Sequence, residues 1–334
     1  MTLSREYTEE ELNDINQKSL QLQNILLNNS ELNEESSEEI INILVTTTNE
    51  ERQLIRAEYK NQNKHPIQDD FNSKLKENYS SFNDICINMF DTPYEYDAKE
   101  LNKVLSSSGS EDDTIIEIFV TRPKNHLEIV DLAYQKFYNV SLKDEIKNHF
   151  QKLFADFLIM IMDAERPLEQ TISGDEAYEI ANNIIKNGYK LYCSDVNEFK
   201  TVFVEKSRED LILISRAYYE TKQKNIFDIF EEENAEKEEE KKVINKNIKL
   251  IKGLLYGVIT PAEFFAKKCI SALTGLNIDI NTLSRVLINR VEIDMFAIRD
   301  YYFKETKNEL PKEIENTCKD HGDVGTILLN LSVQ

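Results

Sequence analysis

The chain has 334 residues and a formal net charge of −21, with only eight Gly, six Pro and no Trp. An acidic surface of this kind argues against a basic nucleic-acid-binding face, and an anionic bilayer should repel it unless a bound cation or a local basic patch intervenes. The length allows a substantial buried core in one large domain or several small ones. The composition favours long helices joined by short polar links over a sheet-rich fold.

The cysteines and the N-terminal segment indicate the compartment. Four cysteines are scattered without metal-ligand spacing, and the first residues contain no apolar signal segment. These features predict free thiols in a reducing cytoplasm. The most apolar stretch, residues 153–162, is too short to cross a bilayer and includes Asp156. No membrane-spanning segment is expected.

The sequence contains an internal repeat. Residues 113–122 align without gaps with residues 281–290, an offset of 168, and two further copies align at offsets of 84 and 75. Apolar residues within each copy recur at i, i+3, i+4 and i+7, which is typical of amphipathic helices. No strand-like alternation is sustained, so the predicted fold class is all-α. One column, interpreted as core packing, holds Tyr59, Tyr134, Tyr218 and Tyr302.

Several segments carry a resemblance to a known family. Residues 92–101 with 109–122, and residues 272–283 with 290–299, resemble annexin repeats. Residues 188–199 resemble the variant loop of the third annexin repeat. The resemblance covers nearly the whole chain. The departures of this sequence from the family pattern are similar to those of divergent protist members such as the alpha-giardins.

The resemblance implies a fold and a function. It implies four repeats of about five helices each, forming a curved disc with calcium loops on its convex face. It also implies peripheral binding to anionic phospholipid without catalysis, and the sequence shows no phosphate-binding loop or nucleophile–base motif. The expected boundaries are an N-terminal head at residues 1–19 and repeats at 20–91, 92–171, 172–259 and 260–334.

A calcium site is expected in the third repeat. Calcium takes several oxygen ligands, and the family places backbone carbonyls of one loop opposite a distant carboxylate. The ligands that the resemblance implies are the carboxylate of Glu233 and the carbonyls of Gly188, Leu191 and Cys193. A left-handed backbone at Cys193 would cost roughly 1 kcal/mol. Alternatively, Glu233 is only a solvated member of the acidic run at residues 231–240.

Tyr192 lies beside this expected site. It occupies a loop position at which third repeats of the family often present an aromatic side chain. The resemblance therefore implies a membrane contact, because a tyrosine has an apolar ring and a polar tip that suit the headgroup boundary. The alternative is a buried packing residue.

The other three repeats depart further from the family pattern. The fourth keeps Gly275, has Asn277 at the second glycine position and has Asp320 near the position of the acid, which implies a weakened calcium site. The second has His149 at the acid position, and imidazole is a poor ligand for calcium, so its site is expected to be lost. The first has no glycine in its loop, and Glu77 has no partner loop of the family type.

A second set of candidates is polar rather than calcium-binding. The resemblance places these residues along the polar central channel of the annexin disc. Buried charges need partners, so ion pairs that fix the packing of the repeats are favoured here over ion conduction. The channel candidates are Asp97, Glu100, Arg122 and Arg285.

The predicted function is calcium-dependent binding to anionic phospholipid membranes, with Ca²⁺ as the cofactor and no enzymatic activity. Calcium would bridge protein oxygens and lipid headgroups. The bound cation would also overcome the repulsion between a protein of net charge −21 and an anionic bilayer. The alternative is a calcium-independent scaffold that attaches to the cytoskeleton or membrane skeleton, and the eroded loops of the first two repeats favour it. A weaker alternative is self-association into an array. Neither nucleic acid nor a small-molecule substrate is expected as a partner.

Overall fold

Helices make up the regular structure of the chain. The computed structural model describes residues 5–28, 33–75, 80–107, 112–230, 238–275 and 277–334. Within these ranges every regular element is a helix and no strand occurs. The predicted all-α class is therefore confirmed. None of the described helices combines the length and the apolar character that a membrane span requires.

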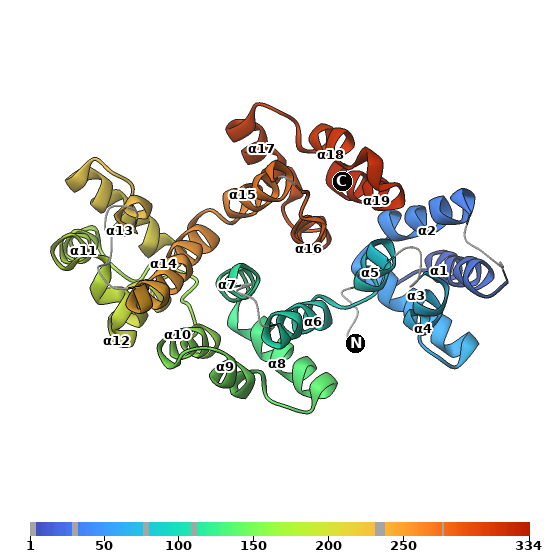
Figure 1. Ribbon diagram of the computed structural model, residues 1–334, viewed down its shortest axis with the longest axis horizontal. Coiled ribbons are helices and arrows are strands. Elements are labelled where there is room, and N and C mark those ends of the chain that lie inside the picture. The colour runs from blue at the N-terminus through green and yellow to red at the C-terminus, as the bar shows by residue number, and fades with distance from the viewer. Residues whose placement is uncertain (1–4, 29–32, 76–79, 108–111, 231–237, 276) are drawn as a thin grey trace. The chain divides into compact units, whose positions relative to one another are not determined.

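The chain divides into two compact units, each of which contains two of the predicted repeats. Unit 1 contains residues 1–96 and 265–334, and unit 2 contains residues 97–264. The helices along the chain fall into four groups of about five helical segments, as predicted (Figure 1). The divisions after residues 96 and 264 fall within two helices, α6 (Pro93–Ser106) and α15 (Pro261–Thr274).

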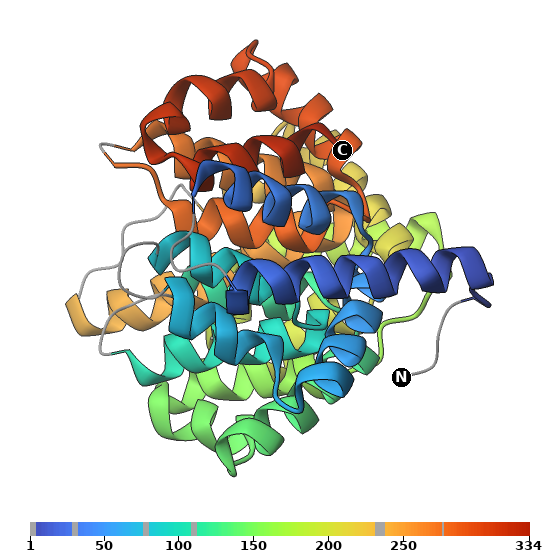
Figure 2. The same cartoon turned by 90° about the vertical axis from the view of Figure 1, so that its right-hand side faces the viewer.

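Unit 1 is built from helices of the first and last groups. The first group contains α1 (Glu9–Gln23), the π-helical turn η1 (Asn24–Asn28), α2 (Glu34–Thr46), α3 (Asn49–Asn63), α4 (Ile67–Leu75) and α5 (Ser80–Met89). The last group contains α16 (Ile280–Arg290), α17 (Met295–Thr306), α18 (Leu310–Cys318), the 3-10 turn η4 (Lys319–His321) and α19 (Asp323–Val333). The C-terminal helix α19 lies beside α2 (Figure 2) and also packs against α5 and α16.

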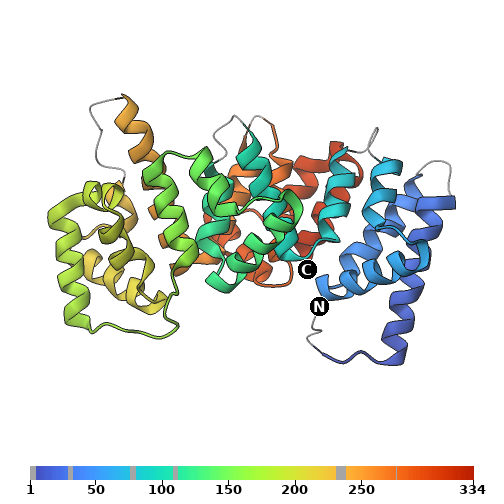
Figure 3. The same cartoon turned by 90° about the horizontal axis from the view of Figure 1, so that it is seen from below.

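Unit 2 contains the middle groups. The first of these contains α7 (Asp112–Thr121), α8 (Lys124–Tyr138), α9 (Leu142–His149) and α10 (Lys152–Asp163). The second contains α11 (Gly174–Ser194), α12 (Val196–Phe199), η2 (Lys200–Val204), α13 (Arg208–Lys222), the 3-10 turn η3 (Ile226–Phe230) and α14 (Glu238–Ile259). Helices α11 and α13 run side by side (Figure 3). Helix α14 packs between that pair and α7 (Figure 1).

Capping residues explain where several helices begin. In each case a Ser or Thr hydroxyl accepts a hydrogen bond from a helical amide, and an acidic side chain accepts one from the amide of the capping residue. This reciprocal arrangement satisfies amides that have no partner within the helix. It occurs in the pairs Thr8–Glu11, Thr48–Glu51, Ser173–Glu176 and Ser207–Asp210.

Asp210 also fixes the segment that joins the two halves of unit 2. Its buried carboxylate accepts hydrogen bonds from the amides of Thr171 and Ile172 and from the Thr171 hydroxyl. Burial alone would raise the pKa of Asp210, but these hydrogen bonds outweigh it and hold the pKa at about 2. The carboxylate is therefore ionised at neutral pH and holds the linker against the start of α13.

Backbone conformation repeats with the same spacing as the sequence. Four non-glycine residues with a left-handed backbone end α3, α8, α13 and α17, and they are Lys64, Asn139, Gln223 and Lys307. Their spacing is 75, 84 and 84 residues, the same as the sequence offsets. Each lies five residues after one of the four column tyrosines, all of which are buried. The interpretation of the tyrosine column as core packing is confirmed.

The first helix spans the expected boundary between the N-terminal head and the first repeat, and that boundary stays a prediction. Helix α1 runs from Glu9 to Gln23 and so crosses the expected boundary after residue 19. The reason is local, because Thr8 and Glu11 form a capping box that starts the helix at Glu9. The remaining repeat boundaries stay predictions.

Two glycines allow α14 to pack closely against α7. A Cβ atom on Gly253 would lie 2.7 Å from Cγ2 of Ile116, and one on Gly257 would lie 2.9 Å from Cγ2 of Val120 and 3.2 Å from its carbonyl oxygen. These distances are shorter than van der Waals contact, so no larger side chain fits without movement of a helix. The same helices are also joined by an ion pair of 3.0 Å between Lys246 and Asp112.

In unit 1 the first and last groups are joined by a buried cation. The guanidinium of Arg52 donates hydrogen bonds to the carbonyls of Leu44 and Met89 and pairs with Glu292 at 3.0 Å. Glu292 also accepts a hydrogen bond of 2.7 Å from the amide of Asn49, at the start of α3. One carboxylate from the turn after α16 thus neutralises Arg52 and caps α3.

Substitution of Gly257 tests the close contact of α7 and α14. We expect Gly257→Val to lower the free energy of unfolding by about 1–3 kcal/mol, because the added methyl groups overpack the interface. Gly174→Val is the matched control, since no atom lies within 4 Å of a Cβ built at that position. Urea denaturation of both variants measures the difference, and equal stability of the two would contradict the packing argument.

Candidate functional site

The expected calcium loop of the third repeat is largely helical. Helix α11 is interrupted only at Gly188, whose φ of 67° and ψ of 178° turn the chain, and helical structure then continues to Ser194. Glycine tolerates this backbone conformation without a steric penalty. Cys193 is not among the described residues with a positive φ, so its backbone does not carry the cost of a left-handed conformation.

Two of the three expected carbonyl ligands in this segment already accept hydrogen bonds. The Cys193 carbonyl accepts one of 2.7 Å from the side-chain amide of Asn247, a buried residue of α14. The Leu191 carbonyl accepts bonds from the Asp195 amide at 2.9 Å and the Ser194 hydroxyl at 3.3 Å. Calcium could bind these oxygens only after the hydrogen bonds break. Sequence reasoning missed Asn247, because nothing local marks a partner so far along the chain.

Tyr192 lies in the core of unit 2 and not at a surface. Its side chain is only 2% exposed, and its ring meets that of Phe203 edge-on at 5.4 Å between centroids. Burial raises the pKa of Tyr192. Tyr192 therefore occupies the buried position that the packing alternative describes, and the expected membrane contact stays a prediction. An aromatic ring flanked by the buried Cys193 and Tyr189 is held by the apolar interior.

Several expected ligands lie outside the described residues. These include Glu233, which was expected to close the third-repeat site, and Glu77 in the first repeat. His149, at the acid position of the second repeat, is described and makes an edge-on contact with Phe150.

The fourth-repeat candidates Gly275 and Asn277 lie in the segment that joins α15 to α16. Gly275 and Asn277 lie outside any helix, and a Cβ atom at Gly275 would lie 3.0 Å from the Asn277 carbonyl oxygen. Among the described residues, no hydrogen bond takes the carbonyl of Gly275 or Asn277 as its acceptor. Asp279 ends the loop, where its amide bonds to the Ala272 carbonyl and its carboxylate caps α16.

The carboxylate expected to complete the fourth-repeat site is exposed. Asp320 lies in the turn η4, and no hydrogen bond or ion pair among the described residues joins it to the loop. Thr317, at the family's acid position, donates its hydroxyl hydrogen to the Glu313 carbonyl instead. The described part of the chain contains no cluster of three His, Cys, Asp or Glu side chains that could bind a metal.

Two of the channel candidates form a buried ion pair in unit 2. Asp97 is fully buried, and both its oxygens accept hydrogen bonds from Arg122, at 2.7 and 3.1 Å. His126 adds a third hydrogen bond at 2.8 Å. Burial alone would raise the pKa of Asp97, but Arg122 and His126 outweigh it and hold the pKa below its usual value. Sequence reasoning missed His126, although it follows Arg122 by only four residues.

The other two channel candidates are also buried. Glu100, in unit 2, is paired with Lys103 at 2.7 Å. Arg285, on α16 of unit 1, has a guanidinium that donates a hydrogen bond of 3.4 Å to the Thr282 hydroxyl. The pairing seen within each unit fits a structural role for these charges.

Comparisons with known proteins give a consistent result. The model of the annexin family matches residues 31–82, 96–161 and 264–331. The chain is 27% identical to mouse annexin A3 over 87% of this chain and 86% of that protein, and 26% identical to human annexin A4 over 87% of each. The solved structure of annexin III superposes with a TM-score of 0.84 at 24% identity, covering 99% of this chain and 96% of that one. A calcium-bound structure of alpha-14 giardin gives 0.76 at 14% identity, with 96% and 99% covered.

Removal of Arg122 tests the structural role of the buried pair. We expect Arg122→Gln to lower the free energy of unfolding by about 3 kcal/mol, because Asp97 would remain buried without its cationic partner. Since the folded-state pKa of Asp97 is lowered, its contribution is present above about pH 4 and is lost as the pH falls. Thermal unfolding at neutral pH measures the effect, with the exposed Arg216→Gln as control. A loss no larger than that of the control would favour a channel role.

Truncation of Tyr192 tests its assignment to the core. We expect Tyr192→Ala to destabilise the protein by about 3 kcal/mol, the usual loss for a buried aromatic ring. The matched control is Tyr219→Ala on α13, whose side chain is about half exposed. If the two variants had the same melting temperature, the buried position of Tyr192 would be wrong.

Proposed function

Because this chain belongs to the annexin family, whose members generally bind phospholipid in a calcium-dependent manner, we propose that it docks on anionic membranes through bound calcium. The observation that carries the proposal is the open loop at Gly275 and Asn277, whose carbonyl oxygens are available to a cation. The family is generally non-enzymatic, and we propose a cytoplasmic protein that binds membranes peripherally.

Electrostatics support a role for a cation. A protein with a net charge of −21 and an anionic bilayer repel each other. A bound Ca²⁺ reverses the local sign, because it is coordinated by protein oxygens on one side and by lipid phosphate or carboxylate oxygens on the other. The protein need not fill the coordination sphere, since calcium takes six to eight oxygens.

The fourth-repeat loop is the better candidate site. The carbonyls of Gly275 and Asn277 would supply two ligands, and Asp320 would add a carboxylate when the turn η4 approaches the loop. Asn277 suits the second glycine position, because Asn tolerates unusual backbone angles better than most residues. Few protein ligands predict weak binding, so half-saturation is expected well above resting cytosolic calcium.

The third-repeat site would bind calcium only after a local rearrangement. The Cys193 carbonyl would have to exchange the Asn247 amide for the ion, and Glu233 would have to supply the carboxylate. A net hydrogen bond contributes about 1 kcal/mol, so this exchange weakens binding without forbidding it. We therefore propose that this segment fills after the fourth-repeat loop.

The alternative is a calcium-independent scaffold bound to the cytoskeleton or membrane skeleton. The hydrogen-bonded carbonyls of Leu191 and Cys193 favour it, because they leave the third repeat without a formed cation loop. The two functions differ in one property, which is the dependence of membrane binding on calcium.

Vesicle cosedimentation separates the two functions. We expect the protein to pellet with phosphatidylserine vesicles when calcium is added and to return to the supernatant with chelator. Phosphatidylcholine vesicles are the control for headgroup charge and should not bind. Equal pelleting with calcium and with chelator would support the scaffold instead.

Two carboxylate substitutions identify the site that is used. Asp320→Asn should shift the calcium midpoint of vesicle binding upward by about threefold to tenfold, since tenfold corresponds to 1.4 kcal/mol. The control is Asp300→Asn, which removes a half-exposed carboxylate of α17 in the same unit. Glu233→Gln should shift the calcium midpoint more than Glu232→Gln if Glu233 is a ligand. The two variants should have the same midpoint if Glu233 is only a solvated member of the acidic run. A calcium midpoint that moves in neither Asp320→Asn nor Glu233→Gln would exclude both sites.

A further inference from the structure

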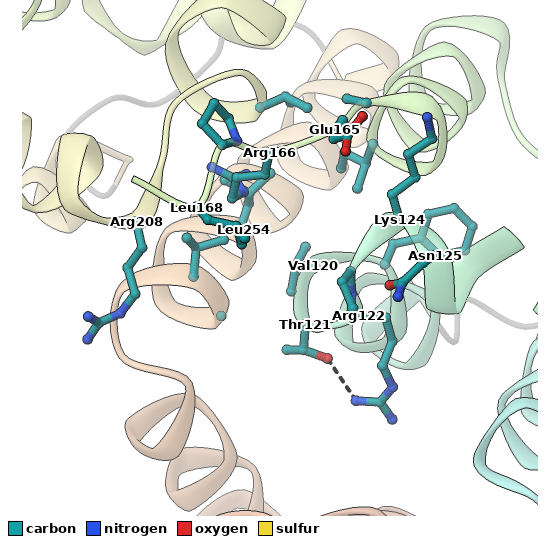
Figure 4. Close-up of a pocket in the computed structure, with 18 of the residues that line it drawn as sticks. Val120, Thr121, Arg122, Lys124, Asn125, Glu165, Arg166, Leu168, Arg208 and Leu254 are labelled. Atoms are coloured by element: carbon teal, nitrogen blue, oxygen red, sulfur yellow. Dashed lines mark hydrogen bonds between the residues drawn. The ribbon is translucent and has the colours of Figure 1, made fainter. Parts of the chain in front are cut away.

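Unit 2 contains a cavity that none of the expected calcium sites uses. Its volume is about 770 Å³, within the range of small-molecule sites. Residues of α7, α8, α10, α13, α14 and the segment after α10 line it. Figure 4 shows Arg166, Leu168 and Leu254 on one side, Lys124 and Asn125 on the other, and Val120 between them.

Arg166 is the unusual charge in this lining. Its guanidinium donates hydrogen bonds to the carbonyls of Phe203, at 2.8 Å, and of Lys206. It has no ion-pair partner among the described residues, and burial lowers the pKa of Arg166 to about 10. A guanidinium has five N–H donors, so three remain for another acceptor. A largely desolvated cation without a carboxylate attracts an anion.

The other cations of the lining already have partners, and the lining also contains the carboxylates of Glu128, Glu165 and Glu209. Arg122 is bound to Asp97, and its side chain extends away from the centre of the cluster (Figure 4). Arg208 also extends away, and it donates a hydrogen bond to the Ile259 carbonyl. Lys124 has Glu128 at 3.8 Å. Arg166 is therefore the cation available to a ligand.

The N-terminus of α8 adds to the positive potential. This 15-residue helix begins at Lys124 without a capping side chain and without an acidic residue in its first turn. Its first two residues, Lys124 and Asn125, line the cavity. The positive end of the helix dipole therefore lies at the cavity wall.

Apart from Thr121 and Glu209, the remaining lining is apolar, and one part of it is unusually exposed. The Leu168 side chain is 93% exposed, although it lines the cavity together with the apolar Leu254. Single exposed leucines are common on protein surfaces. At the mouth of a cavity, however, contact between a leucine and an apolar ligand chain would remove apolar surface of both from water. A ligand with an anionic group but no apolar chain would not contact this surface.

We propose that this cavity binds an amphipathic anion, with one phosphate or carboxylate group at Arg166 and an apolar chain along Leu168 and Leu254. The binding is independent of calcium, because no expected calcium ligand lines the cavity. It therefore does not depend on the proposed membrane function.

Calorimetric titration in the presence of chelator tests the ligand class with three probes. Octyl phosphate, kept below its micellar concentration, combines head and chain and should bind saturably with one site per protein. Octyl glucoside has the chain with a neutral head, and inorganic phosphate has the charge without a chain. Both should bind at least tenfold more weakly. Equal affinity of octyl phosphate and octyl glucoside, or no saturable binding of octyl phosphate, would overturn the proposal.

Substitution at the exposed mouth locates the site without disturbing the fold. Leu168→Asp should weaken octyl phosphate binding at least tenfold and leave the melting temperature unchanged, because the side chain is on the surface. Leu132→Asp, 66% exposed on α8 and outside the cavity lining, is the control and should bind as the wild type does. Unchanged affinity in Leu168→Asp would place the bound probe elsewhere and refute the site. Arg166 is left intact, since it also caps the carbonyls at the end of η2.

Discussion

The close approach of α14 to α7 is the contact on which most of unit 2 depends. Gly253 and Gly257 remove the side chains that would hold the helices apart, and the Lys246–Asp112 pair joins their other ends. With α14 in this position, Asn247 reaches the Cys193 carbonyl, and Leu254 forms a wall of the cavity. The third-repeat loop and the cavity are thus consequences of one helix contact, although they lie on different parts of α14.

The third and fourth repeats use the same helical framework but leave their loops in different states. In the third repeat, the side-chain amide of Asn247 donates a hydrogen bond to the Cys193 carbonyl, which the family pattern assigns to calcium, and Tyr192 is buried in the core. In the fourth, the carbonyls of Gly275 and Asn277 have no partner among the described residues. The difference follows from hydrogen-bond satisfaction, because a buried carbonyl must find a donor whereas an exposed loop carbonyl can bond to water.

The sequence was sufficient to predict the repeated framework but not the loops. The offsets predicted the positions of the buried tyrosines because core packing repeats with the helices, and the left-handed caps follow the same spacing. The hydrogen bond that occupies the Cys193 carbonyl was not predictable, since its donor, Asn247, lies 54 residues later in the chain. His126 and Arg166 were missed for a related reason, because their roles come from partners that tertiary structure supplies.

Separate physical terms hold the framework and the loops, so one can change without the other. Burial of Tyr134 or Tyr302 stabilises a repeat by removing apolar surface from water, and this contribution needs no cation. A loop glycine such as Gly275 contributes little to that core, so its neighbours can be replaced at small cost to folding. His149 at an acid position is therefore compatible with an intact second repeat. Loss of a calcium ligand removes a binding function while the helices around it keep every contact that folds them.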